Sequence, residues 1–102
     1  MRLQPDDRRA RILQAAVDLA AADGYSALTR DGVAKAADVS PGLVIRYFYA
    51  MKMLRQAVMQ VAVDRGIHRI LAAGLVEGCP VAHAAPLELK ITALRAVVGG
   101  AE

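Results

Sequence analysis

Three side chains in this sequence could act as a nucleophile, a base or a soft metal ligand: His68, Cys79 and His83. The two histidines are far apart along the chain, and no carboxylate lies at helical spacing from both. A hydrolytic triad or a zinc cluster needs several such groups to converge on one point. We therefore expect no catalytic residues, no metal site and no cofactor, and we interpret Cys79 as a half-buried thiol in a loop.

The basic residues are concentrated in the first half of the chain. Residues 1–56 hold nine Lys and Arg against six Asp, which accounts for the whole net charge of +3, whereas residues 57–102 hold four basic and four acidic residues. All four aromatic residues also lie in the first half. This distribution is typical of a polyanion-binding head joined to an assembly module. A merely solvated basic surface explains a charge of +3 nearly as well.

The clearest local signal is the run Ser40-Pro41-Gly42. A serine before a helix can accept hydrogen bonds from its first amides, and a proline at the first helical position needs no donor. We expect this helix to cover residues 41–48, after a shorter helix that Thr29 caps and that ends near Asp38. These two helices and the turn between them form a helix-turn-helix, whose second helix lies in the major groove of DNA.

The other expected elements are also helical. Apolar residues at three- and four-residue spacing predict a first helix from about Asp6 to a stop at Gly24. A long helix is expected over residues 51–71, with Gly66 as a weak point inside it, and a final helix over residues 86–98 after a loop. The predicted fold class is all-α with five helices.

This pattern divides the chain into two parts. Residues 1–56 are predicted to form a DNA-binding head, with the helix-turn-helix at 29–48, and residues 57–102 a short helical dimerisation segment. The long helix is apolar on nearly all sides, and 56% of the residues are hydrophobic, so some apolar surface should be buried against a second copy. The residues predicted at this dimer interface are Val61, Ile67, Ile70, Leu71, Leu87, Ile91, Leu94 and Val98.

Residues 9–63 resemble the DNA-binding head of the TetR-type repressors. The resemblance covers more than half of the chain and includes the spacing of residues as well as their type. The matching residues are Ile12, Ala15, Ala16, Leu19, Gly24, Tyr25, Thr29, Val33, Ala34, Ala37, Val39, Ser40, Gly42, Tyr47, Phe48 and Leu54.

The resemblance implies which side chains meet DNA. Thr29 and Arg30 would contact phosphate, and Leu43 could contact a thymine methyl group. Arg46 is the best candidate for reading a base, because a guanidinium can bond to guanine O6 and N7 together; a phosphate contact is the alternative. The full predicted set is Thr29, Arg30, Ser40, Gly42, Leu43, Arg46, Tyr47 and Lys52.

The sequence departs from the family pattern at three places. Ile45 replaces a frequent tyrosine, Asp31 replaces a frequent arginine, and Met51 stands where a lysine is usual, with Lys52 one residue later. We expect Lys52 to act in its place, since a lysine is a flexible point charge. These departures keep an alternative open, in which the chain is a protein-interaction module, such as an antirepressor, that retains the fold without sequence-specific DNA binding.

The resemblance also implies a function. We expect a transcriptional repressor that binds a palindromic operator in double-stranded DNA as a homodimer. Relatives usually carry a further helical domain for an inducer, and the shorter chain here predicts no inducer pocket of that kind. A signal peptide and an apolar stretch long enough to span a membrane are not apparent, so we expect a cytoplasmic protein. Short regulators of this kind resemble those of plasmids and other mobile elements.

Overall fold

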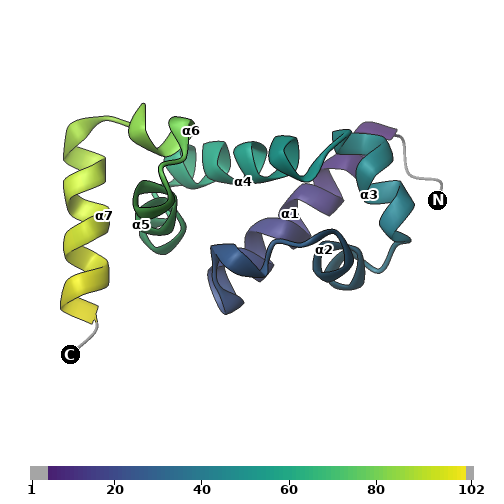
Figure 1. Ribbon diagram of the computed structural model, residues 1–102, viewed down its shortest axis with the longest axis horizontal. Helices are drawn as coiled ribbons and strands as arrows, with labels where there is room; N and C mark the ends of the chain where they lie inside the picture. Colours follow the sequence, from purple (N-terminus) through teal and green to yellow (C-terminus); the bar gives the residue numbers. More distant parts are fainter. Residues whose placement is uncertain (1–4, 101–102) are drawn as a thin grey trace.

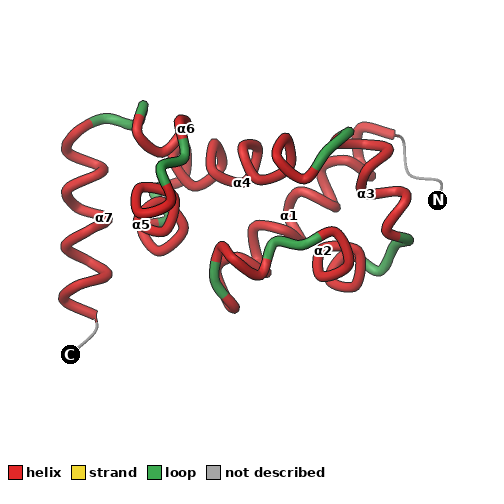
Figure 2. Tube along the Cα trace, viewed as in Figure 1, coloured by secondary structure: helices red, strands yellow, loops and turns green. Residues whose placement is uncertain are grey.

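The computed structural model describes residues 5–100, with side chains for residues 7–97. Within this part of the chain every regular element is a helix, and short turns join them (Figure 2). Among these helices, none is long and apolar enough to cross a membrane. The elements are α1 (Pro5–Asp23), the 3₁₀ helix η1 (Tyr25–Ala27), α2 (Arg30–Ala37), α3 (Pro41–Phe48), α4 (Met51–Arg65), α5 (His68–Glu77), α6 (Pro80–His83) and α7 (Leu87–Gly100).

Helix α4 runs along the molecule and connects two groups of helices (Figure 1). The helices α1, α2 and α3 pack together at one end, and α5, α6 and α7 lie at the other. The Cα trace measures 42 × 25 × 25 Å, so the two groups are separated along the long axis. Helix α3 and the last helix α7 therefore lie at opposite ends of the molecule.

A single apolar core extends through both groups. The buried residues form one continuous cluster from α1 to α7, and among the described residues none that is buried is polar or charged. Leu54 and Val58 of α4 are fully buried at the middle of this cluster. The boundary predicted at residue 56 lies between them, inside α4, so the core is continuous across it.

The helix-turn-helix forms at the predicted residues. Thr29 precedes α2, and its side-chain oxygen accepts a hydrogen bond from the amide of Gly32 at 3.0 Å. Asp38 ends α2 in the left-handed conformation (φ 57°), which an aspartate tolerates better than most residues. Ser40 then caps α3 by accepting a hydrogen bond from the amide of Leu43 at 3.3 Å. Both caps were expected from the residue types alone.

The prediction of five helices is wrong, because the described residues contain seven. Gly66 adopts a left-handed conformation (φ 68°) that ends α4, and the amide of Ile67 bonds back to the carbonyl of Ala62 at 2.8 Å. This arrangement is a helix stop rather than a weak point within a helix. The chain then turns sharply into α5, which crosses α4 and is seen end-on in Figure 1. The predicted loop contains α6, which begins at Pro80.

The turn after Gly66 places two residues of the predicted dimer interface in the chain's own core. Ile70 and Leu71 are both fully buried there. Close packing of α5 depends on Gly74, since a Cβ there would collide with Met59 and come within 3.0 Å of the Cβ of Ala82. The small residues of α5 thus allow it to lie directly against α4 and α6.

The other predicted interface residues differ in exposure. Val61 and Ile67 are half-buried, and they pack against the core. Val98 lies in α7 but outside the residues whose side chains the structure describes. The exposed members of the predicted set are Leu87, Ile91 and Leu94, all on α7.

Candidate nucleic-acid interface

Helix α3 presents a small, open surface to solvent. Gly42 and Arg46 are exposed and lie four residues apart, so they share one face of the helix. Arg46 makes no hydrogen bond or ion pair with any described residue, which leaves its guanidinium free to bind another molecule. The opposite face, with Val44 and Phe48, is buried in the core and sets the orientation of the helix.

Gly42 is not required by the packing of this chain. A Cβ built at this position meets no atom within 4 Å. By contrast, a Cβ at Gly32 would lie 2.9 Å from the Thr29 hydroxyl oxygen and 3.0 Å from the carbonyl oxygen of Ala27. The glycine in α2 is therefore explained by the fold, whereas the glycine in α3 leaves space for a close approach from outside.

The start of α2 combines a hydroxyl with a paired cation. The oxygen of Thr29 accepts the capping hydrogen bond, so its hydrogen is still able to donate to a phosphate. The Nε atom of Arg30 lies 3.4 Å from an oxygen of Asp31, and both side chains are largely exposed. The aspartate that departs from the family pattern therefore pairs with its neighbour.

Arginines of α1 lie alongside α3. Arg8 and Arg11 line a hollow of about 320 Å³ together with Ser40 and Leu43, next to the start of α3. The guanidinium of Arg9 lies 4.6 Å from the centre of the Phe48 ring, near the end of α3. Their positions beside α3 follow from the packing of α1, which sequence spacing alone does not reveal.

The remaining predicted residues are placed differently. Leu43 and Tyr47 are half-buried, and both pack against the core. Lys52 is exposed on the first turn of α4, where it lines a second hollow with Tyr25 and Glu77. The structure thus groups Ser40, Gly42, Leu43, Arg46 and Tyr47 on α3, and it places Lys52 beside a different cluster.

Residues 12–58 match the family described as bacterial regulatory proteins, tetR family. This segment is a TetR-type DNA-binding head. The matched residues lie within residues 9–63, where the sequence resembles this family, and they contain the whole helix-turn-helix. The chain is therefore a DNA-binding transcription regulator. Comparisons with curated proteins and with solved structures found no match.

Tyr49, directly after α3, is an exposed residue of the TetR-type head in an unusual backbone conformation. It has a positive φ of 67°, is 82% exposed, and donates its amide hydrogen to the carbonyl of Ile45 at 2.6 Å. A non-glycine residue at this φ costs about 1–3 kcal/mol. The sequence signal for it is an aromatic residue at a helix end where glycine is usual.

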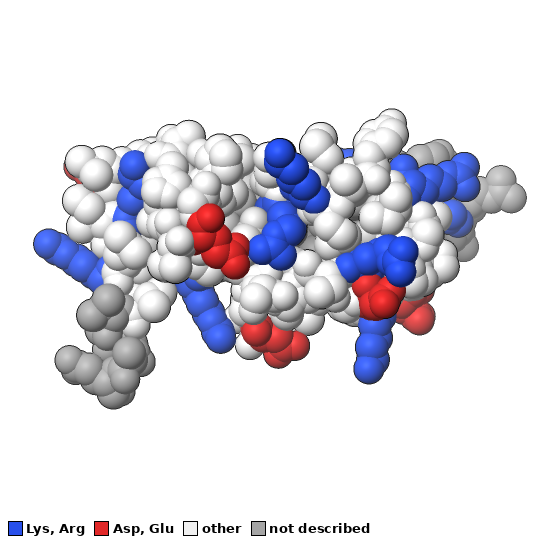
Figure 3. All heavy atoms as spheres, viewed as in Figure 1, with Lys and Arg blue, Asp and Glu red and all other residues white. Residues whose placement is uncertain are grey.

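Charge is unevenly distributed over the surface of the TetR-type head and the rest of the chain. On the face shown in Figure 3, Lys and Arg side chains lie over α1, α2 and α3 with Asp and Glu between them, and others lie over the middle of the molecule and near α7, whereas the region over α6 is mainly uncharged. A cationic surface attracts nucleic acid from a distance, and the effect weakens as salt is added.

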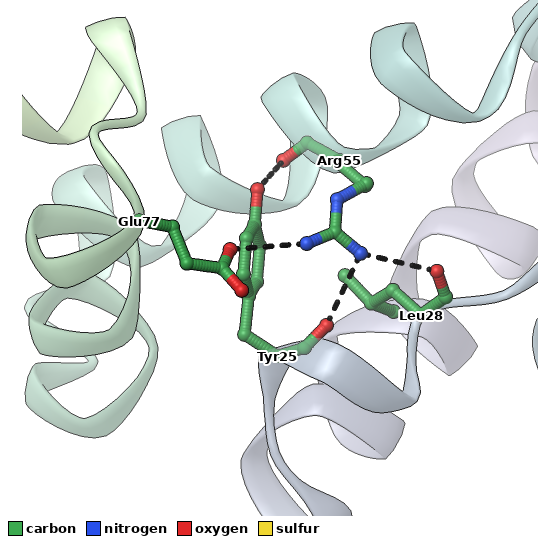
Figure 4. Close-up of polar contacts among 4 residues, drawn as sticks. All are labelled: Tyr25, Leu28, Arg55 and Glu77. Atoms are coloured by element: carbon green, nitrogen blue, oxygen red, sulfur yellow. Dashed lines mark hydrogen bonds and ion pairs between the residues drawn. The ribbon is translucent and has the colours of Figure 1, made fainter.

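A polar cluster joins the TetR-type head to the later helices (Figure 4). The guanidinium of Arg55 lies 4.3 Å from the centre of the Tyr25 ring, and the Tyr25 hydroxyl donates to the carbonyl of Arg55 at 3.1 Å. Burial, with a smaller effect from the nearby Cys79, raises the pKa of Tyr25 to about 12. The phenol therefore stays neutral and remains a hydrogen-bond donor at physiological pH.

Proposed function

We propose that this TetR-type regulator is a repressor that binds an inverted-repeat operator as a homodimer. The observation that carries the proposal is the contrast between the two ends of the molecule. At one end α3 exposes an unpaired arginine and an open glycine, and at the other α7 exposes large apolar side chains. The first surface suits DNA, and the second suits a protein partner.

The DNA contacts divide into base reading and phosphate binding. Arg46 would bond to a guanine edge in the major groove, and the openness at Gly42 would let the backbone of α3 approach the DNA closely. Thr29 and Arg30 would contact the phosphate backbone on the side of α2, with Arg8 and Arg11 as further cations. Ser40, Leu43 and Tyr47 would complete the contact surface of α3, and Lys52 would contribute a phosphate contact from α4.

The proposed partner at the other end is a second copy of this chain. Leu87, Ile91 and Leu94 are 66%, 41% and 42% exposed, and Val76 of α5 beside them is 83% exposed. Together with Leu75 and two polar residues, they line a hollow of about 370 Å³. An exposed apolar patch of this kind is typical of an interface rather than of a free surface.

The charges on α7 favour an antiparallel pairing of two copies. Leu87, Ile91 and Leu94 follow a spacing of four and three residues, as at the contact positions of paired helices. Glu88 and Arg95 each follow a contact position and carry opposite charges. When two such helices run antiparallel, Glu88 of each copy lies opposite Arg95 of the other, so the pairing is self-complementary and closes as a two-fold dimer.

Such a dimer accounts for repression. It would hold two α3 helices in successive major grooves, about 34 Å apart, on the two halves of an inverted repeat. A dimer bound over a promoter excludes RNA polymerase. We further propose that repressor concentration, rather than a small inducer, controls occupancy. The close contact of Gly74 with Met59 and Ala82 supports this, because it leaves no room for a ligand between these three residues.

Selection from randomised duplex DNA at about 0.15 M salt tests the proposal, because nonspecific contacts are weakened at that salt concentration. We expect enrichment of an inverted repeat whose halves are about one helical turn apart. Enrichment of a single, unpaired site would contradict the dimer. Capture without enrichment, or no capture by folded protein, would contradict sequence-specific binding and favour the protein-interaction alternative.

A further inference from the structure

Helix α5 is attached to the head by polar contacts at both of its ends. Among the described residues, its side chains make two such contacts: Arg69 with the carbonyl of Ala21, and Glu77 with Arg55. Arg69 lies in the first turn of α5, and Glu77 is its last residue. We call these two interactions the anchor contacts.

The first anchor contact caps a helix of the head. The Nη1 atom of Arg69 donates to the carbonyl oxygen of Ala21 at 2.9 Å. Ala21 lies within the last four residues of α1, whose carbonyls have no partner inside their own helix. The contact therefore satisfies a group that α1 leaves free, and it fixes the first turn of α5 to the end of α1.

The second anchor contact fixes the other end of α5 through a guanidinium that is already held in place. The Nη1 atom of Arg55 donates to the carbonyls of Tyr25 and Leu28, at 3.4 and 3.2 Å. Its Nη2 atom donates to a carboxylate oxygen of Glu77 at 3.1 Å (Figure 4). Because the head orients the guanidinium, the position of Glu77 is set relative to the head.

Both anchor contacts lead to the same part of the head. Ala21, Tyr25 and Leu28 lie at the end of α1 and in the connector that runs directly into Thr29, the cap of α2. Helix α5 follows the turn at Gly66, a residue whose added Cβ would meet no atom within 4 Å. The buried residues Ile70 and Leu71 hold α5 against the core, and the anchor contacts add polar restraints on the angle between α5 and the head.

We infer that the anchor contacts determine which spacing between operator half-sites this regulator accepts. The inference rests on the proposed dimer. Helix α7 packs against α5, so the angle of α5 sets where the dimer surface lies relative to α3. One base pair more or less between the half-sites moves a half-site by about 3.4 Å and rotates it by about a tenth of a turn. A regulator in which the angle between α5 and the head is fixed discriminates against such shifts, whereas one in which this angle can change tolerates them.

The test compares affinities for a series of operators, built from the repeat that the wild type selects, with the spacer changed by one or two base pairs. The variants are Glu77→Ala and the double variant Arg69→Ala with Glu77→Ala; Arg55 is kept because it also holds the head. Asp64→Ala is the matched control, since it removes the same charge from an exposed site at the end of α4 where its partner is Gln60. Circular dichroism, sedimentation and affinity for one isolated half-site are measured for every protein.

We expect the ratio of affinities between the best spacing and its neighbours to fall about two- to fivefold in Glu77→Ala, as for the loss of one partly exposed ion pair. It should fall further in the double variant, while half-site affinity and dimerisation stay unchanged and the control behaves as the wild type. An unaltered ratio in the double variant would overturn the inference and leave the dimeric repressor intact. A wild type that shows no preference for paired half-sites would overturn the proposed function and the inference together.

Discussion

The two ends of this molecule expose different kinds of surface, although the same apolar core supports both. At the α3 end the exposed groups are Arg46 and the open backbone at Gly42, and an exposed tyrosine follows in a strained conformation. At the α7 end they are aliphatic, with Leu87 and Leu94 both exposed. The first surface is polar and directional, and the second is apolar and extended along one helix.

The difference indicates two separable roles. Polar groups on a rigid helix can distinguish one base from another, because a wrong base leaves hydrogen bonds unmade. Aliphatic side chains contribute affinity without such directionality. If the ends have these roles, a change at the α7 end should weaken binding to all operators equally, whereas a change at the α3 end should alter which operator is preferred.

The largest expected effect comes from Leu94→Asp. A carboxylate in the apolar surface of α7 should prevent dimerisation, because the free energy needed to desolvate the charge exceeds the free energy gained by burying the surrounding apolar area. Operator affinity should then fall by about 100-fold or more as the second half-site is lost. Sedimentation and titration of operator DNA measure both quantities. Since Leu94 is 42% exposed, the monomer of this variant should stay folded. If Leu94→Asp still forms dimers, the interface lies elsewhere.

Arg46→Ala is expected to have the next largest effect, a loss of about 1–3 kcal/mol of binding free energy. The loss should be confined to operators with the preferred base at one position, so selectivity there should relax. Titration against operators substituted at each position measures it. An equal loss on every sequence would make Arg46 a phosphate contact and would weaken the contrast between the two ends.

Gly42→Ala separates DNA binding from folding. The added methyl meets no atom of the chain, and alanine favours a helix, so the free energy of unfolding should rise by up to about 1 kcal/mol. If the DNA backbone approaches α3 closely, the added methyl group should displace it, and operator affinity should fall by about tenfold. Denaturant titration and operator titration are made on the same preparation. Unchanged affinity would show that α3 lies further from the DNA.

The smallest effect tests the antiparallel pairing of α7. Glu88→Arg should weaken the dimer by about 0.5–1 kcal/mol, because two like charges then face each other across the interface. Adding Arg95→Glu exchanges the charges and should restore the dimer. Sedimentation at low salt measures the three dissociation constants. If the double variant dimerises no better than Glu88→Arg, the two helices do not run antiparallel in this register.

Local chemistry explains why the head was predictable. Thr29 and Ser40 act as caps in the structure because the hydrogen bonds that they accept come from residues three positions away. The buried face of α3 likewise follows from the spacing of Val44 and Phe48. Such signals lie within a few residues of each other, and they suffice to define a helix-turn-helix.

The later helices were less predictable because a glycine is ambiguous by itself. Gly66 can lie within a helix or end one, and the structure shows that it ends α4. Gly74 lies within a helix, where the sequence predicted a loop, and Met59 and Ala82 pack closely against it. A glycine is compatible with each of these outcomes, and the residues that contact Gly74 are distant in sequence, so the neighbouring residues did not predict where the helices end.

The sequence by itself determined the fold class, the bounds of the two helices of the helix-turn-helix, and the residue types on the exposed face of α3, because these depend on short-range caps and on periodicity. Only the tertiary structure decided that Ile70 and Leu71 belong to the chain's own core, that arginines of α1 lie beside α3, and that Arg55 and Glu77 meet. Each of these depends on the turn at Gly66 or on the packing of helices that are distant in sequence. The exposed surface is what remains after that packing, and it is therefore a property of the whole fold.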